Sequence, residues 1–290
     1  MTTLFVDGSH GTVGLALQPH LDQLQAEGLI TQAPPLPEEH RKDTAARAAA
    51  YRNADLVVLC LPDALAADAA ALALSVNPNV RILDASAAHR CQSTWLYGLP
   101  ELPAIRRKDF RNAQLVANPG CFATGCILMS QPLVEWRPGC GWAEPSFAFQ
   151  GMTGYSAAGH KGRPGPMRMA QLGMPHRHLA EIAHFSDVEP MLTTAIGGWE
   201  RGMMVQTTVK LPLAHALAAC QAAYAGMPNI QVRLATEGPA IHAEMHNGTN
   251  QLTLALAEQP YGGTTLVAAY DNLGKGSAGA AADNLRRMLA

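Results

Sequence analysis

The feature that most constrains the fold is a run of consecutive apolar residues, Leu56–Cys60, which follows Asp55 and precedes Pro62-Asp63. The run lacks any alternation of polar and apolar side chains, so a strand formed by it must be covered on both faces. Strands of this kind belong to parallel sheets, whose crossover connections are usually helices. Similar short runs recur at 80–85 and 114–117, and Pro62-Asp63 is a typical helix start. The sequence therefore predicts a parallel sheet with helices on both faces.

The N-terminus supplies a further strand and helix of the same kind. The β-branched and apolar run Thr3–Val6 ends in Asp7-Gly8, and a helix-like stretch follows at 12–25. A weaker strand is predicted at 29–33, and Asp43 is expected to cap an Ala-rich helix. Strands that alternate with helices predict an α/β fold, with a Rossmann-type doubly wound parallel sheet over about the first 120 residues.

The second half of the chain has a different pattern. Five strands are predicted with few helices between them, at 146–150, 203–211, 230–234, 252–257 and 264–270. This pattern favours an α+β domain with a mixed, largely antiparallel sheet. A last helical stretch follows at 277–289. We therefore expect two domains, one comprising 1–117 joined by the C-terminal helix region 272–290, and one comprising 118–271.

Composition and charge exclude several classes of protein. Hydrophobic residues make up 48% and charged residues 15%, which is typical of a globular chain. Lys plus Arg total 21 against 23 Asp plus Glu, a net charge of −2, so neither a nucleic acid nor an acidic membrane is an expected partner. The start of the chain lacks the basic and apolar regions of a signal peptide, and no run approaches the roughly 18 apolar residues of a spanning helix. We expect a cytoplasmic protein.

The six cysteines show neither C-x-x-C spacing nor a nearby pair of histidines, so no metal site is predicted. Reduced thiols of a cytoplasmic protein are the expected state. Five of the six are interpreted as small apolar residues: Cys60, Cys91, Cys126, Cys140 and Cys220.

A glycine-rich turn between the first predicted strand and helix is the first chemical signal. It runs Gly8-Ser9-His10-Gly11-Thr12-Val13-Gly14, with the spacing G-x-x-G-x-x-G. Glycines allow a backbone to approach a pyrophosphate, and N–H groups at a helix start bind its negative charge. No acidic residue closes the second strand to hold a ribose hydroxyl, whereas Arg41-Lys42 follows it. These cations favour NADP, with its 2′-phosphate, as cofactor, although a solvated charge pair is the alternative.

The second signal is Asn118-Pro119-Gly120-Cys121, just past the carboxyl end of the last predicted parallel strand. Doubly wound sheets place their ligands at this edge. Pro and Gly form a turn, which puts Cys121 on the first turn of a helix, where the partial positive charge stabilises a thiolate. Cys121 is therefore the candidate nucleophile, whereas Cys126 lies on another side of the same helix and is expected in the core.

These motifs and several others, in order, resemble N-acetyl-γ-glutamyl-phosphate reductases of the shorter of two forms. The further motifs are Leu59-Cys-Leu-Pro-Asp63, Asp84-Ala-Ser86, Tyr97-Gly-Leu-Pro-Glu101, Gly154-Tyr-Ser156, His176-Arg-His178 and Asn272-Leu-Gly-Lys-Gly276. The resemblance implies an NADPH-dependent enzyme of arginine biosynthesis, related in fold to aspartate-semialdehyde and glyceraldehyde-3-phosphate dehydrogenases. It also implies cofactor contacts by Leu61, Pro62, Ser86 and Asn272.

The implied substrate is a small acyl phosphate, which a thiolate can convert into a thioester that hydride then reduces. Such a nucleophile needs an acid–base partner, for which His176 and His178 are the candidates. Similarity to the family's H-x-H motif favours His178. Glu181 is placed either to orient an imidazole or to contact substrate, and an exposed helix glutamate is the alternative.

The anionic groups of the substrate require donors and cations. We predict substrate contacts by Arg90, Asn118, Tyr155, Ser156 and Arg201, with Lys161 as a further candidate. On this interpretation 1–117 binds NADP and 118–271 is a catalytic and dimerisation domain, in a homodimer or homotetramer. Two alternatives remain: a related acyl phosphate reductase of the aspartate-semialdehyde dehydrogenase kind, and a non-catalytic NADP-sensing protein. The sequence does not determine the acyl group or carrier on the substrate amine.

Overall fold

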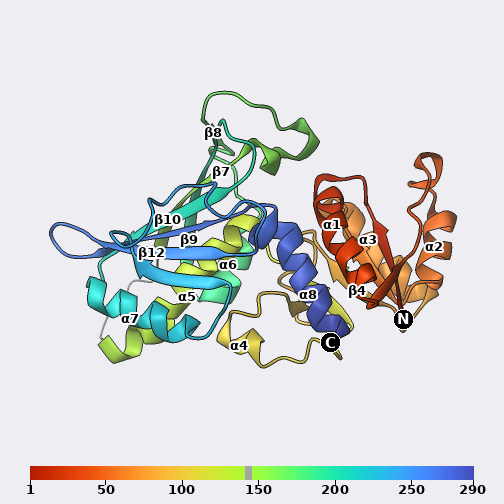
Figure 1. Ribbon diagram of the computed structural model, residues 1–290, viewed down its shortest axis with the longest axis horizontal. Coiled ribbons are helices and arrows are strands. Elements are labelled where there is room, and N and C mark those ends of the chain that lie inside the picture. The colour runs from red at the N-terminus through yellow and green to blue at the C-terminus, as the bar shows by residue number, and fades with distance from the viewer. Residues whose placement is uncertain (141–145) are drawn as a thin grey trace. The chain divides into compact units, whose positions relative to one another are not determined.

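The computed structural model describes residues 1–140 and 146–290, which form two compact units (Figure 1). Unit 1 comprises Met1–Leu99, Arg107–Pro119 and Ser277–Ala290. Unit 2 comprises Pro100–Arg106 and Gly120–Gly276. The assignment of a nucleotide-binding and a catalytic role to separate domains stays a prediction.

Unit 1 is built on a six-stranded sheet in which every neighbouring pair is parallel, in the order β2-β1-β3-β4-β6-β5. The strands are β1 Thr2–Asp7, β2 Ile30–Gln32, β3 Leu56–Leu59, β4 Arg81–Asp84, β5 Leu96–Tyr97 and β6 Leu115–Ala117. All four residues of β3 are buried, as the apolar run requires. The predicted parallel, doubly wound sheet is confirmed, and the short edge strand β5 is an addition.

Helices cover both faces of this sheet. They are α1 Thr12–Ala26, α2 Thr44–Arg52, α3 Asp63–Val76 and α8 Gly279–Leu289, with a 3-10 turn η1 at Glu38–His40. On one face Phe5, Val57 and Ile82 pack in a common core with residues of α2 and α3. On the other, α1 packs beside α8. The Asp43 side chain caps α2 by accepting the N–H of Ala45 at 2.8 Å, as predicted.

Unit 2 is built on a seven-stranded mixed sheet in the order β11-β12-β13-β10-β7-β9-β8. The strands are β7 Ser146–Thr153, β8 Arg168–Ala170, β9 Glu189–Ile196, β10 Met203–Val209, β11 Ile230–Leu234, β12 Leu252–Glu258 and β13 Thr264–Tyr270. Four of the six neighbouring pairs are antiparallel, which agrees with the expected mixed, largely antiparallel sheet. Strands β8 and β9 were not predicted, because β8 is short and Pro190 interrupts the strand pattern of β9.

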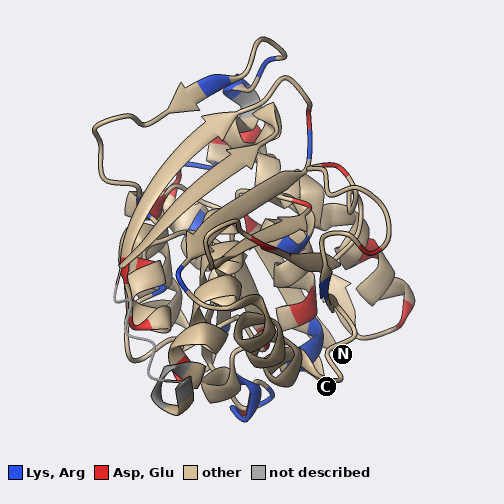
Figure 2. Cartoon of the chain, turned by 90° about the vertical axis from the view of Figure 1, so that its left-hand side faces the viewer, with Lys and Arg blue, Asp and Glu red and all other residues tan. Residues whose placement is uncertain are grey.

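The described part of unit 2 has four α-helices, of which α5, α6 and α7 pack against the sheet. The four helices are α4 Pro103–Arg106, α5 Cys121–Cys140, α6 Leu179–Ser186 and α7 Leu213–Tyr224, with a 3-10 segment η2 at Tyr155–Lys161 and a π-helical turn η3 at Gly274–Ala278 that leads into unit 1. Helix α5 contacts β7, β10 and β13, and α7 contacts β11 and β12. The long strands of the sheet are free of charged residues over most of their length (Figure 2).

Candidate active site

The candidate nucleophile Cys121 is the first residue of α5 and is only partly buried. Three hydrogen bonds at Gly120 hold the turn that precedes it, and one of them joins it to a residue 61 positions away. The buried carboxylate of Glu181 accepts the N–H of Gly120 at 2.8 Å, and the Gly120 carbonyl accepts both the N–H and the hydroxyl of Thr124, at 2.9 and 3.0 Å. The predicted helix start is confirmed, and it places Cys121 in the first turn, where unpaired N–H groups and the helix dipole favour a negative sulfur.

A residue far along the chain also fixes this turn. The buried Tyr270 hydroxyl donates to the carbonyl of Cys121 at 2.5 Å and accepts the N–H of Gly125 at 3.1 Å, so it stands between two groups of the first helical turn. Burial raises the pKa of Tyr270 well above its ordinary value and keeps the hydroxyl protonated. A Cβ on Gly276 would lie 2.9 Å from Cβ of Cys121, so glycine is required there.

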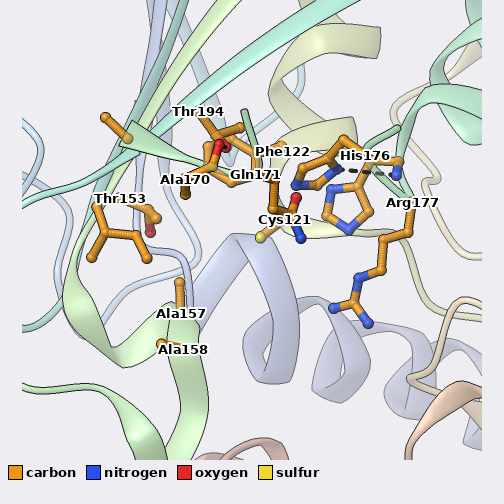
Figure 3. Close-up of a pocket in the computed structure, with 13 residues that line it drawn as sticks. Cys121, Phe122, Thr153, Ala157, Ala158, Ala170, Gln171, His176, Arg177 and Thr194 are labelled. Carbon is orange, nitrogen blue, oxygen red and sulfur yellow. Dashed lines mark hydrogen bonds between the residues drawn. The ribbon is translucent and has the colours of Figure 1, made fainter. Parts of the chain in front are cut away.

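Cys121 opens into a cavity of about 350 Å³ (Figure 3). Its lining comes from the start of α5, the ends of β7 and β9, the η2 segment, β8 and the chain before α6. The lining residues are Cys121, Phe122, Thr153, Ala157, Ala158, Ala170, Gln171, His176, Arg177, His178, Thr194, Ala195 and Ile196. The cavity thus unites the predicted nucleophile with both predicted histidines.

The two histidines differ in environment. Nδ1 of His176 accepts the backbone N–H of His178 at 3.2 Å, so in its neutral form His176 carries its proton on Nε2. Burial, and secondarily the charge of Arg177, lowers the pKa of His176 to about 4. The His178 side chain is 2% exposed, and the two ring centroids are 4.6 Å apart. His176 is therefore a neutral hydrogen-bond donor at physiological pH.

Of the other described cysteines, Cys91 is exposed, which contradicts its interpretation as a small buried apolar residue. Cys60, Cys126 and Cys220 lie in less reactive surroundings. Burial raises the pKa of Cys220 to about 12, and burial together with the charge of Glu181 raises that of Cys126 well above its ordinary value. Cys126 is buried in the core, as expected. The side chain of Cys140 lies outside the described residues. Cys126 and Cys220 therefore stay protonated and are poorly suited to act as nucleophiles.

The predicted substrate cations do not line the cavity. Arg90 is buried in unit 1, where Nε donates to the carbonyl of Asn118 at 2.9 Å. Arg201 forms an ion pair with Asp271 of unit 2, at 2.6 Å. Lys161 is exposed. The cation that does line the cavity is Arg177, which sequence analysis did not select although it lies between the two predicted histidines.

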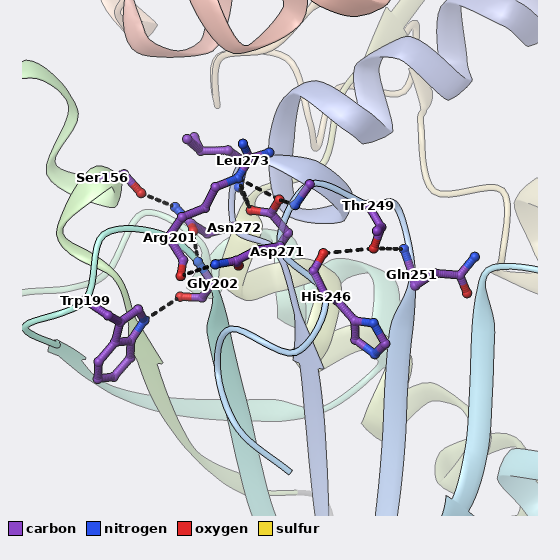
Figure 4. Close-up of polar contacts among 12 residues, drawn as sticks. Ser156, Trp199, Arg201, Gly202, His246, Thr249, Gln251, Asp271, Asn272 and Leu273 are labelled. Carbon is purple, nitrogen blue, oxygen red and sulfur yellow. Dashed lines mark hydrogen bonds and ion pairs between the residues drawn. The ribbon is translucent and has the colours of Figure 1, made fainter. Parts of the chain in front are cut away.

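Several other predicted contacts form a polar network in unit 2 (Figure 4). The Asn272 side chain accepts the N–H of Gly202 at 2.7 Å and donates to the hydroxyl of Ser156 at 3.0 Å. The N–H groups of Tyr155 and Ser156 donate to the carbonyls of Trp199 and Glu200. This network ties the segment after β7 to the turn before β10, so Ser156 and Asn272 support the wall that carries Ala157 and Ala158.

The glycine turn of unit 1 has the form expected of a phosphate cradle. Gly8 has φ +86°, and a Cβ there would collide with the carbonyl oxygen of Cys60. A Cβ on Gly14 would lie 2.6 Å from the carbonyl oxygen of Gly8, and the N–H of Gly11 donates to that same oxygen at 2.9 Å. Only a backbone without side chains at Gly8 and Gly14 fits this turn at the start of α1.

The cations at positions 41, 42 and 47, between β2 and the end of α2, fall into two groups. Arg47, which was not predicted, is paired with Asp7 at 2.8 Å and also contacts Tyr51, whose hydroxyl donates to the same carboxylate. Arg41 and Lys42 follow η1, with Lys42 exposed and Nε of Arg41 buried without a hydrogen-bond partner in the described part of the chain. Arg41 and Lys42 therefore stay the candidates for a 2′-phosphate.

The remaining predicted cofactor residues lie at the carboxyl ends of β3 and β4. Pro62 precedes α3, and Leu61 lies beside Gly8. The Ser86 hydroxyl donates to the fully buried carboxylate of Asp84 at 2.7 Å. Residues 1–140 and 146–290 contain no group of three His, Cys, Asp or Glu side chains that could hold a metal ion, and no helix among them is long and apolar enough to cross a membrane.

A parallel sheet with a glycine turn, joined to a mixed-sheet unit that presents a cysteine at a helix start, defines a protein of the semialdehyde dehydrogenase class. Residues 121–272 match the family model described as "Semialdehyde dehydrogenase, dimerisation domain", which indicates an oligomer. A solved structure of aspartate semialdehyde dehydrogenase with NADP from Candida albicans has the same fold, with a TM-score of 0.68, 12% identity and coverage of 100% of this chain and 98% of that chain.

Two curated relatives narrow the class further. N-acetyl-γ-glutamyl-phosphate reductase of Burkholderia orbicola is 35% identical over 99% of this chain and 97% of its own length. N-acetyl-γ-glutamyl-phosphate reductase 2 of Pseudomonas putida is 36% identical over 99% of this chain and 96% of its own length. The chain belongs to the N-acetyl-γ-glutamyl-phosphate reductase family.

Proposed function

We propose that this chain reduces N-acetyl-γ-glutamyl phosphate to N-acetylglutamate 5-semialdehyde, with release of phosphate and NADPH as reductant, in cytoplasmic arginine biosynthesis. The observation that carries the proposal is the cavity of unit 2, in which Cys121, at the start of α5, meets His176, Arg177 and His178. Family membership supports the same reaction.

The first chemical step joins Cys121 to the substrate. The thiolate attacks the acyl carbonyl carbon, a C–S bond forms, and the bond from that carbon to the phosphate oxygen breaks, so phosphate leaves with the electron pair. N–H groups of the first turn of α5 are suited to stabilise the developing negative charge on the carbonyl oxygen. After hydride addition, the C–S bond breaks, the aldehyde is released and the thiolate is restored.

Proton transfer is assigned to His178. A base beside Cys121 takes the thiol proton before attack, and the resulting acid can give it to a departing group. His176 is a poor base at neutral pH, because its pKa is about 4 and Nδ1 already accepts the N–H of His178. The Nε2–H of His176 is instead suited to donate to a substrate oxygen. Arg177 supplies the positive charge for a phosphate or carboxylate group.

The glycine turn of unit 1 fits a dinucleotide, because Gly8, Gly11 and Gly14 leave the backbone accessible at the start of α1. When bound, the nicotinamide supplies the hydride that reduces the thioester. Arg41 and Lys42 are assigned to the 2′-phosphate, which supports NADP over NAD. The Candida albicans dehydrogenase of the same fold, whose structure was solved with NADP, supports the same choice.

The proposed assembly is a homodimer, or a homotetramer built from dimers, formed through the open face of the sheet of unit 2. Residues on this face alternate with the buried ones, and its central part is uncharged, with Glu189 at one end of β9. The residues of the central part are Ala148, Gln150, Met152, Met191, Thr193, Met204, Gln206 and Thr208. Met191 is 59% exposed in the single chain, and the match to a dimerisation domain supports a second copy as its cover.

A coupled assay tests the proposed function. Purified protein is given N-acetylglutamate 5-semialdehyde, phosphate and NADP, and formation of NADPH is followed at its absorption band. We expect a reaction that requires phosphate and that exceeds the rate with aspartate semialdehyde. A faster rate with aspartate semialdehyde would favour the related dehydrogenase. A protein that binds NADP without either reaction, and has no rapidly alkylated cysteine, would be a sensor.

A further inference from the structure

Thr153, the last residue of β7, carries a hydroxyl that the fold does not use. Its side chain lines the Cys121 cavity and is 2% exposed, and Oγ1 is buried without a hydrogen-bond partner among the described residues (Figure 3). Most buried hydroxyls are paired, because an unpaired one loses its bonds to water without replacement. An unpaired hydroxyl in the wall of a substrate cavity is therefore a candidate contact for the substrate.

The part of the cavity wall next to Thr153 consists of uncharged, mostly small side chains. Ala157, Ala158, Ala170 and Ile196 line the cavity near Thr153 and contribute methyl groups. The hydroxyl of Thr194, which also lines the cavity, is engaged with the carbonyl of Ala170 at 3.2 Å. The Thr153 hydroxyl thus lies in largely apolar surroundings with no cation among these neighbours, which disfavours a carboxylate or a phosphate.

The opposite part has another character. In Figure 3 Thr153 and Ala157 lie on one side of Cys121, and His176 and Arg177 lie on the other. The anionic groups of an acyl phosphate substrate are matched by Arg177 and by the Nε2–H of His176. Among the groups of the substrate, the neutral acetamido group is left for the side of Thr153.

We propose that Thr153 and the adjoining alanine wall recognise the N-acyl group of the substrate. The Thr153 hydroxyl donates to the acyl carbonyl oxygen, and the methyl groups of Ala157 and Ala158 pack on the acyl methyl. This assignment rests on the proposed function and names the group that distinguishes the substrate from simpler semialdehydes.

The test compares two aldehydes that differ in this group, N-acetylglutamate 5-semialdehyde and glutarate semialdehyde, which lacks the acetamido substituent. The measured quantity is the ratio of their kcat/KM values with phosphate and NADP. We expect Thr153→Val to lower the ratio about tenfold, the effect of losing one buried hydrogen bond, and Thr153→Ser to retain most of it. An unchanged ratio in Thr153→Val would overturn the assignment.

A matched control and a stability measurement exclude a structural explanation. Thr207 is a buried threonine of the same sheet whose hydroxyl donates to the carbonyl of Ala148 at 3.0 Å, outside the cavity. Thr207→Val is expected to lower the thermal unfolding midpoint and leave the ratio unchanged. Thr153→Val is expected to leave the midpoint unchanged or raise it, since it removes an unpaired buried hydroxyl. A lower midpoint in Thr153→Val would contradict the proposal.

The two levels of inference fail in different ways. A wild-type protein that oxidises neither aldehyde would refute the proposed function and the acyl site with it. A wild-type protein that prefers the N-acetyl compound, with a ratio that Thr153→Val does not change, would refute the acyl site alone.

Discussion

The carboxyl end of β4 in unit 1 and the Cys121 cavity of unit 2 are both lined by polar residues, but they use them differently. In unit 1 the fully buried Asp84 carboxylate accepts the N–H and the hydroxyl of Ser86, and lies 2.6 Å from Nδ1 of His89. The ring of His89 stacks on Trp95 with centroids 4.0 Å apart. The Asp84 carboxylate is thus paired with donors of Ser86 and His89, and these bonds hold the loop that follows β4 in place.

The cavity of unit 2 is lined by polar groups of several kinds. Arg177 is exposed, Cys121 is partly buried at a helix start, and the hydroxyl of Thr153 is unpaired among the described residues. The comparison teaches that residue type alone does not mark a catalytic site. A histidine paired with a buried aspartate occurs in unit 1 as a structural element, whereas the proposed chemistry belongs to the unit whose cavity brings Cys121 together with Arg177 and His178.

The largest expected effect is at the nucleophile. Cys121→Ser keeps nearly the same volume and replaces a thiol by a hydroxyl of much higher pKa, so turnover should fall about a thousandfold or more with an unchanged circular dichroism spectrum. Cys126→Ser is the matched control on the same helix and is expected to affect stability more than turnover. If Cys121→Ser retained more than about a tenth of the wild-type activity, the thioester mechanism would be wrong.

The next prediction separates His178 from His176. His178→Asn should lower turnover about 10²–10⁴-fold, the usual contribution of a general acid–base, and move the pH dependence of Cys121 alkylation toward that of a free thiol, near 8.5. His176→Asn should cost less. Because the lowered pKa of His176 means that it gains a proton only as the pH falls toward about 4, its loss should leave the alkylation profile between about pH 6 and 9 in place.

The outcome of these two variants distinguishes several mechanisms. If His176→Asn lowers turnover more than His178→Asn does, His176 is the general acid–base and the assignment to His178 is wrong. If neither variant loses activity, neither histidine acts as the base for Cys121. The thiolate would then be stabilised by the dipole of α5 alone, at the turn that the Tyr270 hydroxyl holds.

The elements and residues that sequence analysis found share a local cause. The strands β3 and β4 have apolar runs, Asp43 is a local cap, and Pro119 and Gly120 predict the turn before Cys121. Each of these signals comes from a few neighbouring residues, so sequence pattern is sufficient to find the element, although distant residues such as Glu181 also hold the turn. The same holds for Gly8, whose positive φ glycine adopts without strain.

What sequence analysis missed depends on distant parts of the chain. Tyr270 reaches the first turn of α5 from 149 residues away, and nothing in the local sequence of β13 indicates that contact. Sequence analysis selected Arg90 as a substrate contact, but the structure buries it against the carbonyl of Asn118, outside the lining of the cavity. The importance of Thr153 depends on burial and on the absence of a partner in the described chain, which only a tertiary structure reveals.

Arg177 tests whether the cavity of unit 2 supplies the substrate cation. Arg177→Gln should raise KM and lower kcat/KM about 10–100-fold, since a charge-assisted hydrogen bond is worth about 1.5–3 kcal/mol. Arg168, exposed on β8 and not part of the lining, is the matched control, and Arg168→Gln should change kcat/KM less than about twofold. Equal losses in both variants would indicate a general effect of positive charge near the cavity.

The smallest expected effect concerns cofactor binding by unit 1. This unit also contains both kinds of polar group, a cation that is paired within the described part of the fold and cations that are not. Arg47 is neutralised by Asp7, whereas Arg41 and Lys42 follow the second strand and have no ion pair among the described residues. Replacement of both Arg41 and Lys42 by Ala should weaken NADPH binding by about 1–3 kcal/mol and leave NADH binding almost unchanged, as measured by fluorescence titration. Arg52→Ala, at the exposed end of α2, is the control. Because only the 2′-phosphate distinguishes the two nucleotides, equal losses for both would show that these cations act on the common part of the cofactor or on the fold.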